Sequence, residues 1–140
     1  MANTQAISGI MKQVALAAVV DGKSLKAALY LASATTNGSN TAYTATGEVS
    51  GTGYTAGGVA VTNANSAGLT STTAYWTPSA SIAYTTVTLA TAFDAVMIYS
   101  TTDTNRNIGV FTFGSQTITA GTFTLTMPTN DSSTGLVRFA

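Results

Sequence analysis

The stretch Thr46–Val61, TGEVSGTGYTAGGVAV, contains five glycines and resembles a phosphate-binding loop in composition. Dinucleotide-binding loops have the spacing G-x-G-x-x-G between a strand and a helix, because the free amides of the helix N-terminus bind the phosphate. Here Gly51, Gly53 and Gly57 have the spacing G-x-G-x-x-x-G, and the following GVAVTNA favours a strand. No Lys with a Ser or Thr follows these glycines in P-loop order. We therefore expect an irregular loop with several residues at positive φ.

Acid–base and metal chemistry have little support in the residue types. The chain has no His and no Cys, which removes the commonest general base, the thiol nucleophile and the usual zinc ligands. Asp103, Asn105 and Asn107 resemble the start of a calcium loop, but its glycine and terminal Glu are missing, so a turn is favoured. No spacing places two carboxylates on one face. We expect no catalytic residue, no cofactor-binding residue and no metal ligand, and a chain that is not an enzyme. The acidic residues are Asp21, Glu48, Asp94, Asp103 and Asp131.

Glu48 is the one charge among the glycines. A carboxylate in such a loop can accept several backbone hydrogen bonds, or it can meet Arg106 or Arg138. Either arrangement would fix the loop or a subunit contact, so the role expected for Glu48 is structural.

The aromatic residues are a possible platform for stacking on sugars. Phe111 and Phe113 alternate with other residues on one predicted strand, which favours a shared core face. Trp76, beside Pro78, is ambiguous, and it leaves open a carbohydrate-binding or host-surface-binding module. The aromatic residues considered are Tyr75, Trp76, Tyr84, Tyr99, Phe111, Phe113 and Phe123.

An amphipathic helix is predicted over about residues 5–19. Ile7, Met11, Val14 and Ala18 recur at spacings of four, three and four, with Thr4 as a possible N-cap and a stop at residues 21–22. The apolar run is too short to span a bilayer. We expect this stripe to pack on the protein's own sheet; the alternative is an arm that docks on a neighbouring subunit. Residues 1–22 are thus assigned to a helical segment and residues 23–140 to a β body.

The rest of the chain predicts an all-β body rich in Thr, Val and Tyr. In SLKAALYLAS, residues 25, 27, 29 and 31 share one strand face, and Asn37–Gly38 marks a turn in the loop that follows. Short strands follow, with hairpins predicted at Ser100–Asn107 and at SQTITAG, which would make the C-terminal half an antiparallel meander. Seven or eight short strands favour a single antiparallel β-sandwich or jelly-roll-like domain.

Charge is unusually scarce. Only 7% of residues are charged, against about 25% in soluble domains, and the five positive and five negative charges cancel. Nucleic-acid binding needs clustered Lys and Arg, so nucleic acid is not an expected partner, and neither is a membrane. A surface with so little self-repulsion is easier to understand if neighbouring subunits cover much of it.

Taken in order, TAYTATGEVSGTGYTAGGVAVTN, FDAVMIYSTTDTNRNIGVFTFG, AGTFTLTMPTND and LVRFA resemble a group of small virion proteins of tailed bacteriophages. The likeness covers nearly the whole chain, and the segment GEVSGTGYTAGG is its most specific part. The chain departs from the group at Asp94, where relatives have Arg or another residue, and it matches loosely over TPSASIAYTTVTLA.

The resemblance implies a non-enzymatic structural role in the virion. The leading expectation is a capsid decoration (cement) protein that binds the major capsid protein lattice as a homo-oligomer, with a trimer favoured. A tail, neck or head-fibre component is the second structural alternative. No cofactor is implied.

Overall fold

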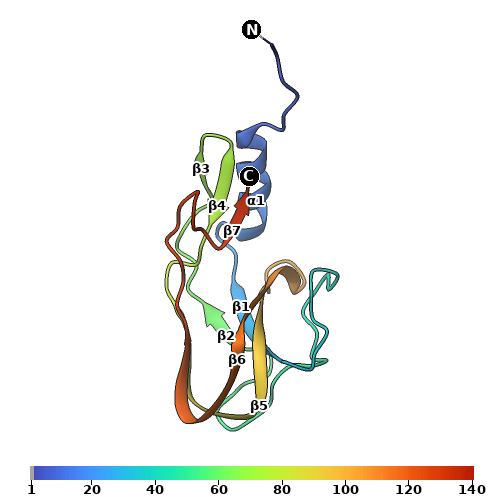
Figure 1. Ribbon diagram of the computed structural model, residues 1–140, viewed down its shortest axis with the longest axis vertical. Helices are drawn as coiled ribbons and strands as arrows, with labels where there is room; N and C mark the ends of the chain where they lie inside the picture. The colour runs from blue at the N-terminus through green and yellow to red at the C-terminus, as the bar shows by residue number, and fades with distance from the viewer. Residues whose placement is uncertain (1) are drawn as a thin grey trace.

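The computed structural model describes residues 2–140. The protein is mainly β, with two antiparallel sheets and one N-terminal helix. Figure 1 shows an elongated molecule with the larger sheet at one end, the helix and the smaller sheet at the other, and residues 2–8 projecting beyond the helix. Its elements are α1 (Gly9–Val20), β1 (Leu25–Leu31), β2 (Val59–Val61), β3 (Gly68–Thr70), β4 (Thr73–Trp76), β5 (Ile82–Ser100), β6 (Arg106–Leu125) and β7 (Val137–Phe139).

The larger sheet has the strand order β2-β1-β5-β6, and all its pairs are antiparallel. The predicted alternation of β1 is confirmed, because Leu25, Ala27 and Leu29 enter the main core. Its other face is buried as well: Ala28 and Tyr30 form a second cluster with residues of β5, beneath the loop that follows β1.

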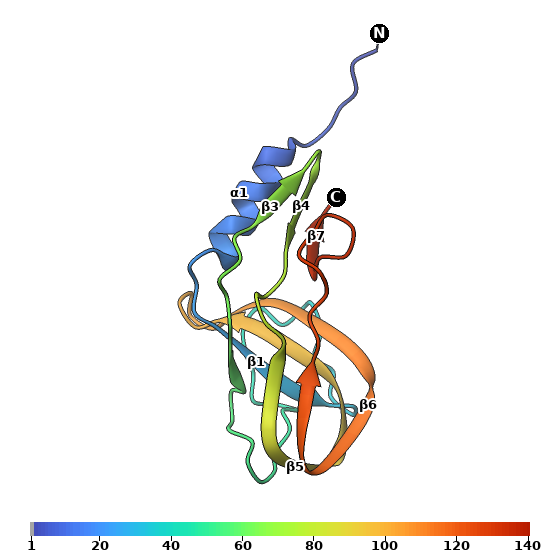
Figure 2. The same ribbon diagram turned by 90° about the vertical axis from the view of Figure 1, so that its left-hand side faces the viewer.

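β5 and β6 form a long ribbon that bends back over the sheet (Figure 2). The end of β5 pairs with β1, yet Tyr84 at its beginning donates a hydrogen bond from its hydroxyl to the carbonyl of Ala27 in β1, at 2.8 Å. The ribbon therefore encloses the main core between its two halves. Register shifts along the β5–β6 ladder, which mark bulges, allow this bend.

One of the two predicted hairpins is confirmed and the other is wrong. β5 and β6 are joined by the turn within Ser100–Asn107, as expected. The segment SQTITAG is not a turn, because it lies inside β6, where Gln116 pairs with Phe93 and Ile118 pairs with Leu89. The C-terminal half is accordingly one ribbon rather than a meander of short strands, and β7 pairs with β4.

The smaller sheet has the order β3-β4-β7 and is covered on one face by α1 (Figures 1 and 2). Leu16 and Val20 of the helix are fully buried, in the same core cluster as Ala74 and Trp76 of β4. The predicted helical segment thus packs on the β body. β3 was not anticipated from the sequence.

The helix differs from the prediction in its start and in its buried face. It begins after Ser8, not near residue 5, and ends at Val20, directly before the stop predicted at residues 21–22. It starts where packing on the sheet begins: a Cβ at Gly9 would lie 2.8 Å from the carbonyl oxygen of Ser71. Helices this short depend on such tertiary contact.

The stripe predicted to be buried is exposed. Ile7, Met11, Val14 and Ala18 all face away from the body, while Gly9, Leu16 and Val20 face the sheet. Both stripes are apolar and have compatible spacing, so periodicity did not distinguish them. No helix within residues 2–140 is long and apolar enough to cross a membrane.

Candidate functional site

The glycine-rich stretch is an irregular loop, as predicted, and it packs against the larger sheet. Positive φ angles occur at four of its glycines, and Val49 donates a backbone hydrogen bond to Leu29 of β1. A Cβ at Gly53 or Gly58 would overlap a backbone carbonyl, of Thr86 and Ala27 respectively. The segment leads into β2 and not into a helix, so it has none of the helix amides that bind phosphate.

Glu48 anchors this loop. Its Oε1 accepts hydrogen bonds from the Tyr54 hydroxyl and the Gly57 amide, both at 2.7 Å, and its Oε2 accepts one from the Tyr43 hydroxyl at 2.6 Å. The Tyr54 hydroxyl in turn accepts a hydrogen bond from the Leu29 amide of β1. The predicted structural bonding of Glu48 is therefore present, although tyrosines supply two of the three donors.

Neither arginine meets Glu48. Arg138 donates to the carbonyl of Ser133, and within residues 2–140 the ion pair that forms is Lys23 with Asp103, at 3.2 Å. Glu48 thus accepts hydrogen bonds from three neutral donors of its own chain, which suits a structural anchor.

The tyrosines around Glu48 are poorly suited to acid–base work. The pKa of the Tyr30 hydroxyl is raised to about 12, mainly by burial; a hydrogen bond to Thr44 lowers it, and the Glu48 charge adds a smaller increase. Burial is also the main cause that raises the pKa of Tyr54, Tyr84 and Tyr99, with Glu48 contributing to each. These hydroxyls remain neutral donors at neutral pH.

Two other acidic side chains that were weighed as sites, Asp103 and Asp131, stabilise turns, whereas Asp94 lies within β5. Asp103 lies in the β5–β6 turn, where its pKa is lowered mainly by the hydrogen bond from Lys23. Asp131 accepts from the backbone amides of Ser133 and Thr134, and these bonds lower its pKa. Within the described chain, no group of three or more His, Cys, Asp or Glu side chains gathers to hold a metal ion.

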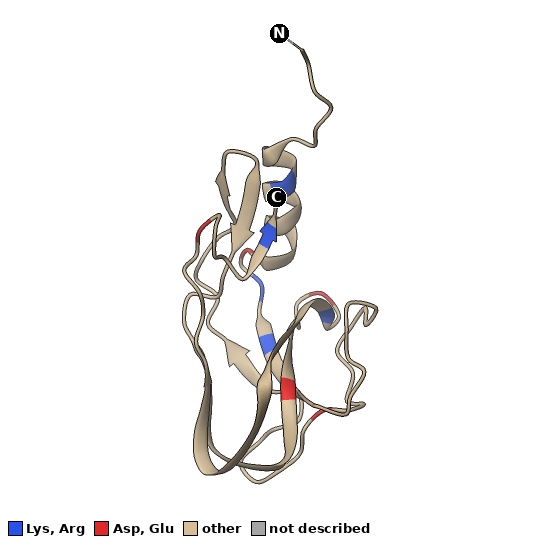
Figure 3. Cartoon of the chain, in the orientation of Figure 1, with Lys and Arg blue, Asp and Glu red and all other residues tan. Residues whose placement is uncertain are grey.

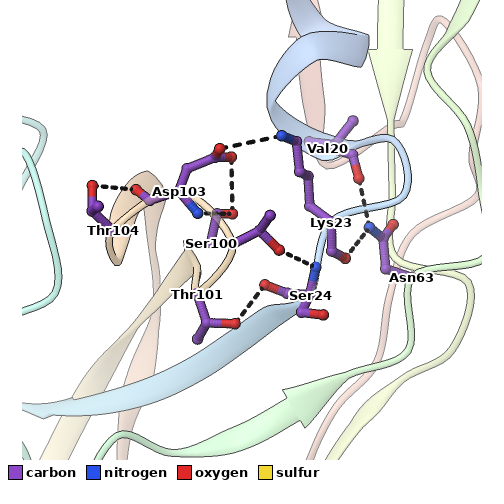
Figure 4. Close-up of polar contacts among 9 residues, drawn as sticks. Val20, Lys23, Ser24, Asn63, Ser100, Thr101, Asp103 and Thr104 are labelled. Carbon is purple, nitrogen blue, oxygen red and sulfur yellow. Dashed lines mark hydrogen bonds and ion pairs between the residues drawn. The ribbon is translucent and has the colours of Figure 1, made fainter.

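A polar junction joins the end of α1 to both sheets (Figure 4). Asn63 donates from Nδ2 to the carbonyls of Val20 at 2.6 Å and Lys23 at 3.1 Å, and its Oδ1 accepts from the Trp76 indole at 3.1 Å. The backbone carbonyl of Ser24 accepts from Thr101 of the β5–β6 turn. Asn63 was missed by sequence reasoning, because a single Asn after a short strand looks like an ordinary turn residue.

The aromatic side chains are mostly core, as favoured from the sequence. Trp76 is completely buried, and its indole N–H is already bonded to Asn63. Phe93 packs edge-on against Phe113 and Phe123, with ring centroids 6.1 and 5.0 Å apart. A buried Trp76 cannot stack on a sugar, so Trp76 no longer supports a carbohydrate-binding module.

The most unusual surface is the outer face of α1, formed by Ile10, Met11, Val14, Ala15 and Ala18. Ile10 and Met11 are each 58% exposed and Val14 is 62% exposed, with Ile7 just before the helix at 61%. Charged residues are scattered over the rest of the molecule, and α1 carries one cationic side chain (Figure 3). That side chain, Lys12, donates to the carbonyl of Thr72 on the adjoining sheet at 3.1 Å.

Comparisons with known proteins add no relative: no protein-family model, no curated protein and no solved structure matches the chain.

Proposed function

We propose that this chain is a non-enzymatic structural protein of a tailed-bacteriophage virion, a capsid decoration (cement) protein that binds and stabilises the major capsid protein lattice. The observation that carries the proposal is the resemblance of the GEVSGTGYTAGG segment, and of the chain around it, to small phage virion proteins. The protein would occur in many copies as a homo-oligomer, with a trimer favoured. Its place would be the virion, after assembly in the host cytoplasm.

Two features of the molecule support a structural role. The carboxylate of the glycine loop is held by three donors of its own chain, and the charged turn residues are engaged in local bonds. The exposed side of α1 is apolar and uncharged, which suits burial against other proteins. A protein that binds only the assembled shell stabilises the shell by mass action.

We also propose a finer fold class for the protein. The β5–β6 ribbon folds over the larger sheet and encloses the main core, which supports an antiparallel β-sandwich of jelly-roll-like type. With the helix docked on the smaller sheet, we place the described part of the segment 1–22 and the β body 23–140 in one structural unit.

Copy number in purified virions tests the proposal. Quantitative protein gels should show this chain in a fixed ratio of the same order as the major capsid protein. A ratio far below that of the capsid protein would overturn the cement role and favour the tail, neck or head-fibre alternative. Absence of the chain from purified particles would overturn both.

A further inference from the structure

α1 is apolar on every side, which is unusual for a helix at the surface of a protein. Its sheet-facing side includes Leu16 and Val20, which are buried, and its outer face is equally apolar but exposed. The two polar residues of the helix lie at the margins of the buried side: Lys12 bonds to Thr72 and Gln13 to Ala67. A helix that is apolar all round belongs in a fully buried setting. We therefore expect the outer face to be covered by another protein surface.

The spacing on that face indicates which kind of contact. Met11, Val14 and Ala18 are separated by three and four positions, the a/d spacing by which helices pack side by side. Ile10 widens the same face at its beginning. A second helix with the same spacing of apolar residues could pack against this face.

The surroundings favour a second copy of this chain as that occupant. No charged residue lies on the outer face, so two copies can approach without like-charge repulsion. The helix also lies at one end of an elongated molecule, away from the larger sheet (Figure 1). Copies can thus meet there without collision of their bodies.

We propose that the outer face of α1 is the self-association surface of this protein, and that its occupant is the same face of a second copy. The inference rests on the homo-oligomer of the proposed function and names its interface.

The size of the surface fits a closed ring better than a simple pair. The large exposed side chains supply on the order of 400 Å² per copy, about half of what a standard interface buries on each partner. A ring in which each helix meets two neighbours uses more of the same face. Residues 2–8, all exposed, extend directly from it.

The mass of the protein in solution tests the interface when a charged side chain is introduced into it. We expect the full-length protein to sediment as an oligomer and Val14→Glu to sediment as a monomer with an unchanged circular dichroism spectrum. Ser115→Glu, which adds the same charge at an exposed position of β6, should leave the oligomer intact. A wild-type monomer, or a Val14→Glu oligomer of unchanged mass, would overturn the proposal.

The absence of cysteine from the chain makes a second test possible. In Val14→Cys, mild oxidation should give a covalent dimer on non-reducing gels, because helices packed through this face bring the two introduced thiols within disulfide distance. Ser115→Cys should remain monomeric on the same gel. Equal cross-linking of the two variants would contradict a helix-mediated contact.

A failure of this interface proposal can be distinguished from a failure of the proposed function. Self-association is measured on the purified protein, whereas the virion role is measured by copy number in particles. A monomer in solution whose binding to capsids is lost in Val14→Glu would assign the outer face to the capsid protein and overturn the proposal of a second copy.

Discussion

At the scale of single residues, Glu48 and its donors hold the glycine loop against the larger sheet. Two tyrosine hydroxyls and one backbone amide donate hydrogen bonds to the carboxylate. The Tyr54 hydroxyl also accepts a hydrogen bond from the amide of Leu29 in β1. The position of Glu48 among glycines was enough to predict a structural role. Its tyrosine partners were not predictable, because the loop must fold before Tyr43 and Tyr54 come together.

Glu48→Gln tests this anchor. The amide keeps the size of the side chain but replaces an accepting oxygen by a donor that faces another donor. We expect a loss of about 1–3 kcal/mol in the free energy of unfolding, measured by urea denaturation. Asp94→Asn is the matched control, since it makes the same change on β5 at a residue without such a set of donors, and it should cost less than about 0.5 kcal/mol. Equal effects would contradict the anchoring role.

Gly53 tests the backbone of the same loop. Its φ is +80°, and an added Cβ would meet the carbonyl of Thr86. Gly53→Ala should therefore destabilise the protein by at least about 2 kcal/mol in urea denaturation. Gly38→Ala, in the turn after β1 where no atom lies within 4 Å of an added Cβ, should be nearly neutral. A neutral Gly53→Ala would show that the loop readily rearranges.

The buried tyrosines predict a loss of stability at alkaline pH. Burial raises the pKa of Tyr30 to about 12, whereas unfolded tyrosine titrates near 10. Since the folded state holds these protons more tightly, the stabilisation is complete below about pH 10 and is lost as the pH rises through 10 toward 12. Denaturation midpoints should be flat from neutral pH to about 10 and then fall. Tyrosine absorbance that titrates fully near pH 10 in the folded protein would contradict this.

At the scale of elements, α1 shows what periodicity can and cannot decide. The 4-3-4 spacing correctly indicated a helix, but a helix with only two polar residues has two apolar stripes, and the stripe with Leu16 and Val20 is the one that packs on the sheet. The long strands show a related limit. A hairpin was predicted in the middle of β6 because bulges break the alternation of its residues, and a bulge and a turn look alike in sequence.

Truncation of one side chain on each face of α1 distinguishes the roles of the two faces. Leu16→Ala removes a side chain that is 1% exposed and should cost about 2–4 kcal/mol at any protein concentration. Val14→Ala, on the outer face, should cost less than about 0.5 kcal/mol in dilute protein. Thermal unfolding at two concentrations measures both, and only the Val14→Ala loss should grow with concentration. A large loss for dilute Val14→Ala would mean that the outer face packs within its own chain.

At the scale of the whole molecule, the chain joins a core-bearing sheet to a small helix-covered sheet through the junction at Asn63 and Lys23 (Figure 4). The mainly β class and the N-terminal helix followed from composition and pattern. The two-sheet arrangement did not, because it depends on contacts such as that of Tyr84 with Ala27, which lie 57 residues apart. The absence of a catalytic cluster was an expectation from the missing His and Cys, and it stays a prediction.

An electron-microscopy map of the intact particle tests the proposed role most directly. The cement role predicts density for this fold repeated over the outer surface of the head, bound to the major capsid protein, with the α1 helices of neighbouring copies in contact around a symmetry axis. Density confined to the neck or tail, or a particle without this protein, would contradict it.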